Sequence, residues 1–146
     1  MLDLTNGTLL GTVALEKTPR ALTVSPDGQE LFFTEAGIDA VQVFDIASRR
    51  IVGQIPVGAS PHLPSFTPDG NLGLVVAQGP GELDLVDPSA YTTIGAVKVG
   101  TMPHWTATSA DSSTAYVTNE QSNDVSVVDL GSQTVTASIP VGNAPR

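Results

Sequence analysis

Two histidines, His62 and His104, are the side chains of this sequence best suited to acid–base or metal chemistry. They are 42 residues apart, and each directly follows a proline. One further step of 42 in either direction leads to Arg20 and Arg146, which also follow prolines. Because histidine exchanges protons near neutral pH and binds metals readily, the pair is the first candidate for a functional site. We expect the four residues to occupy the same place in successive units of a repeated structure.

The histidine pair leaves three interpretations open: local hydrogen bonding by loop residues, a proton-transfer or polar contact with a ligand, and ligation of a metal or haem. Two nitrogens on one zinc-like ion must lie within about 4 Å of each other, because metal–nitrogen bonds are near 2 Å. Packed sheets lie roughly 10 Å apart, so His62 and His104 would meet only by converging on a common axis. Local hydrogen bonding is the interpretation we favour, since the sequence has no cysteine and no third histidine. We therefore expect no catalytic residue, no metal site and no cofactor, with haem or copper as the alternative.

The sequence lacks the motifs of several common enzyme classes. It contains no G-x-S-x-G, no H-E-x-x-H and no calcium-loop pattern. Gly79-Pro80-Gly81 lacks the following helix and the lysine of a phosphate-binding loop. An enzymatic role is therefore left open but not favoured.

The composition argues against a nucleic-acid partner and a membrane span. The net charge is −9, and of the six Lys and Arg residues only Arg49 and Arg50 are adjacent, whereas binding to a phosphate backbone needs a basic patch. No run of 18 apolar residues occurs, as a membrane-spanning helix would need. The first residues also lack the basic and apolar regions of a signal peptide.

The step of 42 residues recurs throughout the chain. Prolines stand at 19, 61, 103 and 145, "SPDG" at 25–28 aligns with "TPDG" at 67–70 and "SADS" at 109–112, and Asp45 aligns with Asp87 and Asp129. We therefore divide the single segment 1–146 into the end of one unit (1–18), three full units (19–60, 61–102 and 103–144) and the start of another (145–146). Repeats of this length indicate an architecture of stacked units.

Each unit reads as four short antiparallel strands. In the first unit these are 20–25, 30–35, 40–46 and 50–57, rich in β-branched residues and separated by turn residues. Four strands in about 40 residues is typical of a β-propeller blade. A lone four-stranded sheet cannot bury both of its apolar faces, whereas stacked blades can. The sequence therefore predicts an all-β fold of about three four-stranded antiparallel blades.

Tyr116-Val117-Thr118-Asn119 reads YVTN and is followed by "SNDVSVVDLGSQTVTASIPVG". The chain resembles the YVTN family of β-propeller repeats, best in the third unit and less well at "VVAQ" (75–78). That resemblance implies an extracytoplasmic protein, in the periplasm or on the cell surface, as in surface-layer proteins. It also implies a likeness to the propellers of several redox enzymes, in which histidines at the channel mouth can ligate metals or haem.

The phase of the repeat predicts that the chain is part of a larger propeller, of seven blades. Residues 8–15 are then expected to form one extra outer strand, closing a blade whose inner strands lie elsewhere. Two copies of the chain together have about the length of seven units, but the chain begins and ends at repeat positions that do not join. Each junction of a closed seven-bladed homodimer would therefore lack the two inner strands of a blade. An open arc, or another oligomer through the open blade edges, is the remaining possibility.

Alternate connections of an antiparallel blade share an end, so the loops fall into two groups. The Pro-Asp-Gly turns and the turns after Asp45, Asp87 and Asp129 keep their residues, as structural turns do. The loops at 36–39, 78–81 and 120–123 vary and share the other end, which we call the channel-mouth face. Variable loops on a rigid frame are where binding sites occur. The binding residues expected there are Arg20, His62, His104, Trp105, Gln78, Glu120 and Asn123.

For Trp105, we expect packing between blades, with a stacking platform at the channel mouth as the alternative. For the whole chain, the leading hypothesis is a non-catalytic binding or scaffold module that presents its variable loops to a protein or cell-surface partner. The alternative is the propeller domain of an extracytoplasmic redox or lactonase-like enzyme, with its site near His62 and His104. A purely structural role in a surface array is the third hypothesis.

Overall fold

The computed structural model describes all 146 residues as an all-β fold of twelve strands, with no helix. The strands form three four-stranded antiparallel sheets, each made of strands consecutive in the sequence. The first sheet holds β1 (Pro19–Val24), β2 (Glu30–Glu35), β3 (Ala40–Asp45) and β4 (Arg50–Pro56). The second holds β5 (Pro61–Phe66), β6 (Gly73–Ala77), β7 (Glu82–Asp87) and β8 (Thr92–Lys98). The third holds β9 (Pro103–Thr108), β10 (Thr114–Asn119), β11 (Asp124–Asp129) and β12 (Thr134–Pro140).

The repeat in the sequence reappears as a repeat in strand position and register. β1, β5 and β9 begin at Pro19, Pro61 and Pro103. The register of the outermost strand pair shifts at the same place in each sheet, for example between Val43 and Phe44 in the first. Equal sequences at equal spacing therefore give nearly equal sheets.

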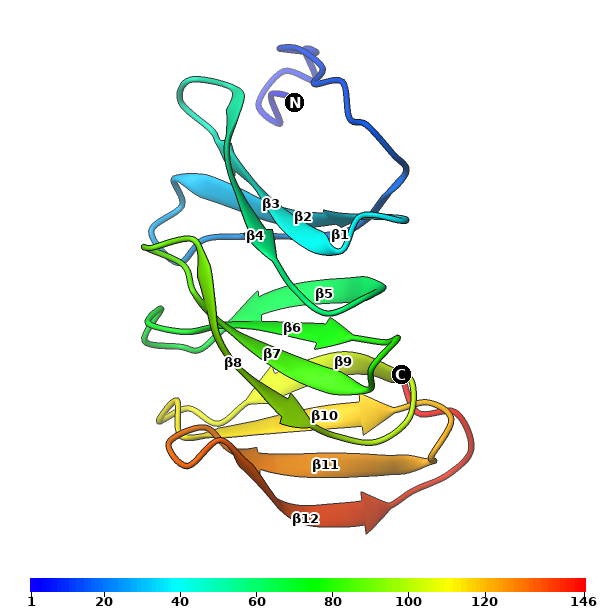
Figure 1. Cartoon of the computed structure of the whole chain (residues 1–146). Helices are drawn as coiled ribbons and strands as arrows, with labels where there is room; N and C mark the ends of the chain where they lie inside the picture. The colour runs from blue at the N-terminus through cyan, green and yellow to red at the C-terminus, as the bar shows by residue number, and fades with distance from the viewer.

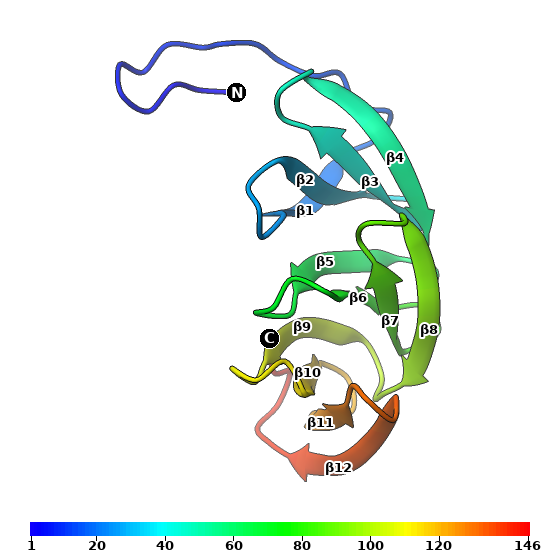
Figure 2. The same cartoon turned by 90° about the vertical axis from the view of Figure 1, so that its left-hand side faces the viewer.

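The three sheets stack face to face in a curved arc (Figures 1 and 2). Figure 2 shows β1, β5 and β9 along the concave side of the arc, and β4, β8 and β12 along the convex side. Pro64 lies within β5, where it is tolerated because β5 is an edge strand of its sheet. The concave side carries the first strand of each sheet, and this is where the candidate site is built.

Each sheet has two faces, which we name by the direction of the chain. The leading face is turned toward the following sheet, and the trailing face toward the preceding one. In the second sheet, Leu74 and Leu85 lie on the leading face and pack with the third sheet, whereas Val75 and Val86 lie on the trailing face and pack with the first.

The hydrophobic core consists of the two interfaces between sheets. Between the first and second sheets the buried residues are Phe32, Val41, Val43, Ile55, Val75 and Val86. Between the second and third they are Leu74, Val76, Leu83, Leu85, Val97, Ala115, Val117, Val128 and Leu130. Burying one such aliphatic or aromatic side chain contributes about 1.5–3 kcal/mol. These contacts, rather than hydrogen bonds within a sheet, decide how the sheets stack.

The extra outer strand predicted for residues 8–15 is not formed, and this prediction was wrong. The only pairing in the first eighteen residues is an isolated bridge between Leu2 and Leu9. An outer strand needs the third strand of a sheet as its hydrogen-bonding neighbour, and every strand of this chain already belongs to a complete four-stranded sheet.

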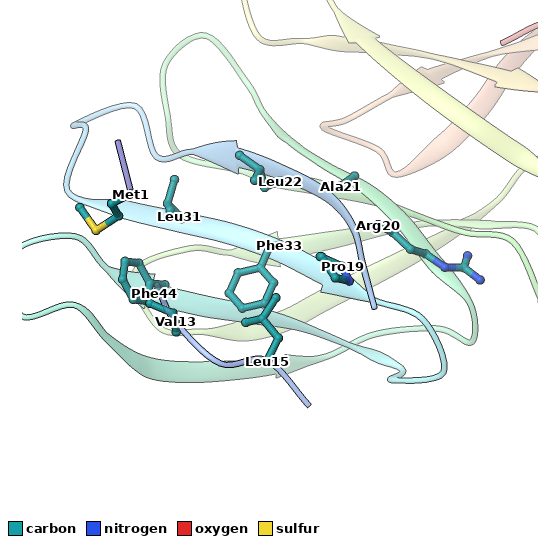
Figure 3. Close-up of a pocket in the computed structure, with 10 residues that line it drawn as sticks. All are labelled: Met1, Val13, Leu15, Pro19, Arg20, Ala21, Leu22, Leu31, Phe33 and Phe44. Carbon is teal, nitrogen blue, oxygen red and sulfur yellow. The ribbon is translucent and has the colours of Figure 1, made fainter. Parts of the chain in front are cut away.

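The N-terminal segment instead lies over the trailing face of the first sheet. Met1, Val13 and Leu15 line an apolar cavity of about 410 Å³ there, together with Phe33 and Phe44 (Figure 3). The Arg49 side chain donates a hydrogen bond to the Leu10 carbonyl at 3.2 Å. The segment thus partly covers an apolar sheet face that no neighbouring sheet covers.

All regular elements of the structure are strands, so it contains no helical segment that could span a bilayer.

Candidate functional site

The variable loops lie together at one end of the sheets and are fastened to one another. The backbone N–H of Gln78 donates to the Ser60 carbonyl at 3.2 Å, and that of Glu120 donates to the Met102 carbonyl at 2.9 Å. Two side chains also join the two loops of one unit to each other. The Asp39 carboxylate accepts the Ser60 N–H at 3.0 Å, and the Asn123 side-chain oxygen accepts the Ala144 N–H at 2.9 Å. The channel-mouth face is therefore one hydrogen-bonded surface rather than separate loops.

His62 and His104 meet at this end of the inner strands. Their ring centroids are 4.4 Å apart with the planes tilted by 38°. The second residues of β5 and β9 thus converge far more closely than two sheets pack. The Nδ1 atoms of both rings are buried and have no hydrogen-bond partner. The hydroxyl of Thr34 donates to the His62 carbonyl at 2.6 Å, which ties the histidine's strand to the first sheet.

An ion pair flanks the imidazoles on one side. Arg146 donates to Glu120 with an Nη2–Oε1 distance of 2.8 Å, and the other carboxylate oxygen of Glu120 lies 3.4 Å from His104 Nδ1. The hydrogen bond from Arg146 lowers the pKa of Glu120 below its ordinary value. The carboxylate is therefore ionised at neutral pH and available as an acceptor beside His104.

The pKa of His62 is lowered from its ordinary value of 6.5. Burial is the main cause, because a charged imidazolium loses solvation there. The positive charges of His104, Arg20 and Arg146 act in the same direction, and a backbone hydrogen bond at His104 opposes them weakly. His62 is accordingly neutral at pH 7, and three other basic groups of the chain lie close enough to affect it.

The remaining predicted site residues are spread over the same face. Gln78 is partly exposed in its loop, and Asn123 adopts a positive φ of 57° at the end of the loop that precedes β11. Arg20 extends away from the apolar residues of the cavity over the first sheet (Figure 3). The sequence placed these residues at one end, but it did not reveal the close contact of the two imidazoles.

Trp105 does not pack between sheets in this chain, contrary to the expectation from the sequence. Its side chain is 50% exposed. Trp105 pairs with Thr118 across β9 and β10 and so shares the leading face of the third sheet. That face carries no cover here, so the indole stands on an open surface beside the channel mouth.

Backbone strain next to the histidines was not foreseen. Ser60, Met102 and Ala144 each have a positive φ of 52° to 56° and each directly precedes a proline. Non-glycine residues adopt this region rarely, at a cost of roughly 1–2 kcal/mol. The repetition of an unfavourable conformation just before β5 and β9, and again before Pro145, indicates that the chain is tightly constrained where it enters an inner strand. Non-glycine residues before these prolines gave no sequence signal for it.

The opposite end of the sheets is built of structural turns, as the sequence predicted. The carboxylates of Asp45, Asp87 and Asp129 accept the N–H of Ser48, Ser89 and Ser132 at 2.6, 2.9 and 2.7 Å respectively. These hydrogen bonds lower the pKa of Asp45, chiefly through Ser48, and that of Asp129, chiefly through Ser132.

A second cavity, of about 440 Å³, lies among these turns between the first and second sheets. Its lining includes Asp27, Glu30, Asp45 and Asp69, and the Tyr91 hydroxyl donates to Glu30. That contact and burial raise the pKa of Tyr91 to about 12. The acidic residues of this cavity are mainly engaged in turn hydrogen bonds, and the sequence gave no reason to expect a hollow here.

The channel-mouth residues offer two imidazoles but no larger set of metal ligands. No group of three or more His, Cys, Asp or Glu side chains converges to hold a metal ion, whereas protein copper sites commonly use several nitrogen or sulfur ligands. An axial haem ligand requires only one histidine. His62 and His104 are side chains of this kind, and the Nδ1 atom of each is buried without a hydrogen-bond partner.

Comparison with known proteins gives a clear result for the fold. No protein-family model matches the chain, and no curated protein matches it. Among solved structures, hydrazine synthase from Kuenenia stuttgartiensis matches 96% of this chain and 41% of its own with a TM-score of 0.84 and 29% identity. The chain folds as blades of a β-propeller.

Two further structures have the same fold at lower identity. Dihydro-heme d1 dehydrogenase NirN in complex with DHE matches 89% of this chain and 29% of its own, with a TM-score of 0.74 and 15% identity. A 6-phosphogluconolactonase-type protein from Bacteroides uniformis matches 88% of this chain and 43% of its own, with a TM-score of 0.74 and 20% identity. The β-propeller chain spans less than half the length of each of these three proteins.

Proposed function

We propose that this chain is a non-catalytic binding module that presents the variable loops of its channel-mouth face to a protein or cell-surface partner. The observation that carries the proposal is the hydrogen bonding of those loops, both to the preceding unit and to the last residues of their own unit. A pre-organised surface loses little conformational entropy on binding, which favours recognition. The likeness of the sequence to YVTN repeats supports an extracytoplasmic location for this module.

The repeat supplies matched variants to test this function. Replacing loop 78–81 or loop 120–123 with the equivalent "AGID" of 36–39 changes the recognition surface and keeps the unit length. Replacing "SADS" at 109–112 with "SPDG" of 25–28 exchanges a segment of the same length at the opposite end. Each protein is immobilised, and the partners it captures from an extracytoplasmic extract are identified by mass spectrometry.

We expect both loop exchanges to abolish capture of the same partner, and the exchange at 109–112 to leave it unchanged. His62→Ala and His104→Ala should also leave capture largely intact. Capture that survives both loop exchanges, or that is lost equally with the exchange at 109–112, contradicts the proposal.

A second candidate function is a redox or lactonase-like enzyme domain with its site at the channel mouth. The contact between His62 and His104, whose Nδ1 atoms lack partners, favours it. It is also supported by the likeness to enzymes, one of them a dehydrogenase in complex with DHE. In this function the histidines would hold the cofactor, a haem-type group would supply the electron transfer, and Arg20 would face its anionic substituents.

Titration with haemin separates the two functions, because imidazole ligation changes the Soret absorption. Under the enzyme hypothesis the chain binds haemin in equal stoichiometry, and His62→Ala or His104→Ala weakens binding at least tenfold. Under the binding-module hypothesis the spectrum of haemin does not depend on either histidine. Unchanged binding by both alanine variants would rule out the cofactor site.

A further inference from the structure

We propose that Arg20, His62 and His104 form a binding site for an anionic oxygen group, a carboxylate or a phosphate, at the channel mouth. The Arg20 guanidinium and the two imidazoles hold this group, and its binding is coupled to the uptake of a proton. The inference is independent of the partner that the variable loops recognise, because the three residues belong to the inner strands and not to the loops at 78–81 and 120–123.

The inner strand departs from regular pairing at each of these three residues. Its register with the neighbouring strand shifts at Arg20 in the first sheet, at His62 in the second and at His104 in the third. A β-bulge of this kind takes a residue out of the regular pairing and re-aims its side chain, and bulges are common beside active sites. Ser60 and Met102, both with positive φ, stand two residues before the histidines. The backbone irregularity thus recurs from sheet to sheet, and each time it carries a basic side chain.

Positive charge is concentrated around the imidazoles of an otherwise acidic chain. The net charge of the chain is −9, yet Arg20 and Arg146 both lie close enough to His62 to affect its pKa. Glu120 is the carboxylate beside the histidines, and it already accepts a hydrogen bond from Arg146 at 2.8 Å. Arg20 forms no salt bridge. Two guanidinium groups against one carboxylate leave a positive charge that an anionic oxygen group would compensate through charge-assisted hydrogen bonds.

The imidazoles have an accessible nitrogen for such a group. Nδ1 of His62 and of His104 is buried without a partner, and the distance of 3.4 Å from His104 Nδ1 to Glu120 does not give a hydrogen bond. The Nε2 atoms also have no partner in the fold, but they are not buried, so they are the nitrogens that a ligand reaches. With the ring centroids 4.4 Å apart, one anionic group can contact both rings.

Binding of an anion would draw a proton from solvent onto the histidine pair. Burial first, and then the charges of His104, Arg20 and Arg146, lower the pKa of His62, and a bound anion offsets those positive charges. On His104, a proton added to Nδ1 lies next to the ionised Glu120. Because an anion favours the charged form of an imidazole, its affinity should increase as the pH falls through the range in which the pair titrates.

This dependence on pH separates the anion site from haem ligation. An imidazole must be neutral to bind a metal, so protonation weakens a haem complex. The same protonation strengthens the binding of an anion. The two uses of His62 and His104 therefore respond to acidification in opposite directions.

The test follows the imidazole Hε1 signals of the full chain by proton NMR. The sequence has only two histidines, so the two signals can be assigned with His62→Gln. Sodium sulfate serves as the probe for a phosphate group and sodium acetate as the probe for a carboxylate, with sodium chloride at the same ionic strength as the reference for screening. We expect saturable shifts with sulfate, acetate or both, and the probe that binds more tightly identifies the type of group.

The affinity for the tighter probe should increase by about fivefold between pH 7.5 and pH 5.5, the scale of one exposed charge pair. At saturation the probe should raise the pKa of His62 by about 0.5 above its value in chloride, since an adjacent opposite charge favours the protonated form.

A matched pair of arginine variants tests the site. Arg20→Gln should weaken binding of the probe by about fivefold. Arg50→Gln makes the same change of charge at an exposed residue that begins β4, at the opposite end of the sheets, and should leave binding unchanged. In the double variant His62→Gln, His104→Gln, followed through backbone amide shifts, the affinity should no longer depend on pH. If circular dichroism shows that this variant does not fold, His62→Gln should show a reduced dependence in its place.

Three results would overturn the proposal. The first is a response to sulfate and acetate that does not saturate or that chloride reproduces, which would indicate an adventitious ion only. The second is an equal loss of affinity in Arg20→Gln and Arg50→Gln. The third is an affinity that stays constant or decreases as the pH falls from 7.5 to 5.5.

Discussion

At the scale of single residues, the feature that matters most is the pair of imidazoles at the channel mouth. The rings are in contact, yet neither Nδ1 atom has a hydrogen-bond partner. An unpaired polar atom in a buried position costs stability, commonly about 1–3 kcal/mol. A fold that retains two of them at one place holds a polar site that a ligand or a neighbouring blade could satisfy.

The lowered pKa of His62 predicts how stability depends on pH. Between the folded pKa and the ordinary value of 6.5, the unfolded chain binds more protons than the folded chain. The stabilising contribution is therefore complete above pH 6.5 and is lost as the pH falls below it. We expect the urea midpoint of the wild type to decrease from pH 7.5 to pH 5.5, and the decrease to be smaller in His62→Gln.

The acidic side chains do not produce this decrease. Burial raises the pKa of Asp84, so its contribution to stability has the opposite sign and is the same in wild type and His62→Gln. The pKa values of Glu120 and Asp45 are lowered, so their contributions are lost only at more acidic pH. Equal decreases in wild type and His62→Gln between pH 7.5 and 5.5 would show that His62 stays solvated and that its burial is not what shifts its pKa.

At the scale of the elements, the turns opposite the channel mouth explain why the repeat keeps its residues. Gly28 and Gly70 end the first two Pro-Asp-Gly turns with positive φ angles of 73° and 75°. In the third turn Ser112 stands at the same position with a φ of 62°, a backbone conformation that is strained for a residue other than glycine. The same residues recur at these positions because the turns require a particular backbone conformation, and not because they bind a ligand.

A matched pair of glycines separates the cost of backbone conformation from that of contact between units. Gly28→Ala meets no atom within 4 Å of the new Cβ and should cost about 1–2 kcal/mol for its conformation alone. In Gly70→Ala the new Cβ lies 3.1 Å from Cγ of Pro26, in the neighbouring turn. We expect a larger loss of unfolding free energy for Gly70→Ala in urea denaturation. Equal losses would mean that the Pro26 ring moves away freely.

At the scale of the whole molecule, stability comes from the burial of apolar side chains between neighbouring sheets. Leu85 is fully buried in the cluster between the second and third sheets, whereas Ile94 lies exposed on the outer strand β8 of the same sheet. Hydrogen bonds also join these two sheets, such as that between the hydroxyls of Ser65 and Thr106 at 2.7 Å, and the buried cluster supplies the apolar contact between them.

Truncation of that cluster should have a large effect. We expect Leu85→Ala to lower the unfolding free energy by about 2–5 kcal/mol, because it removes transfer free energy and leaves a cavity. Ile94→Ala, the control, should change it by less than about 1 kcal/mol. Both are measured by urea unfolding followed by circular dichroism. A similar effect of the two substitutions would contradict the assignment of the core to the sheet interfaces.

The repeated residue pattern was enough to predict the blade fold and the end of the sheets at which each loop lies. Strand alternation, turn residues and the step of 42 are local signals that repeat, so they predicted four strands per unit and placed Pro19, Pro61 and Pro103 at equivalent strand starts. The same reasoning correctly identified Asp45 and its equivalents as turn residues. It also predicted that His62 and His104 lie on the same face.

The residue pattern did not predict what lies on the outer faces of the first and third sheets, or how closely the channel-mouth residues meet. Residues 8–15 have an apolar pattern suited to a strand, but no free neighbour exists for hydrogen bonding, so they cover Phe33 and Phe44 instead. Trp105 is exposed for a related reason, because its sheet has no following sheet. Whether an apolar residue is buried, and whether two side chains 42 residues apart touch, depends on contacts between units, which a pattern within one unit does not contain.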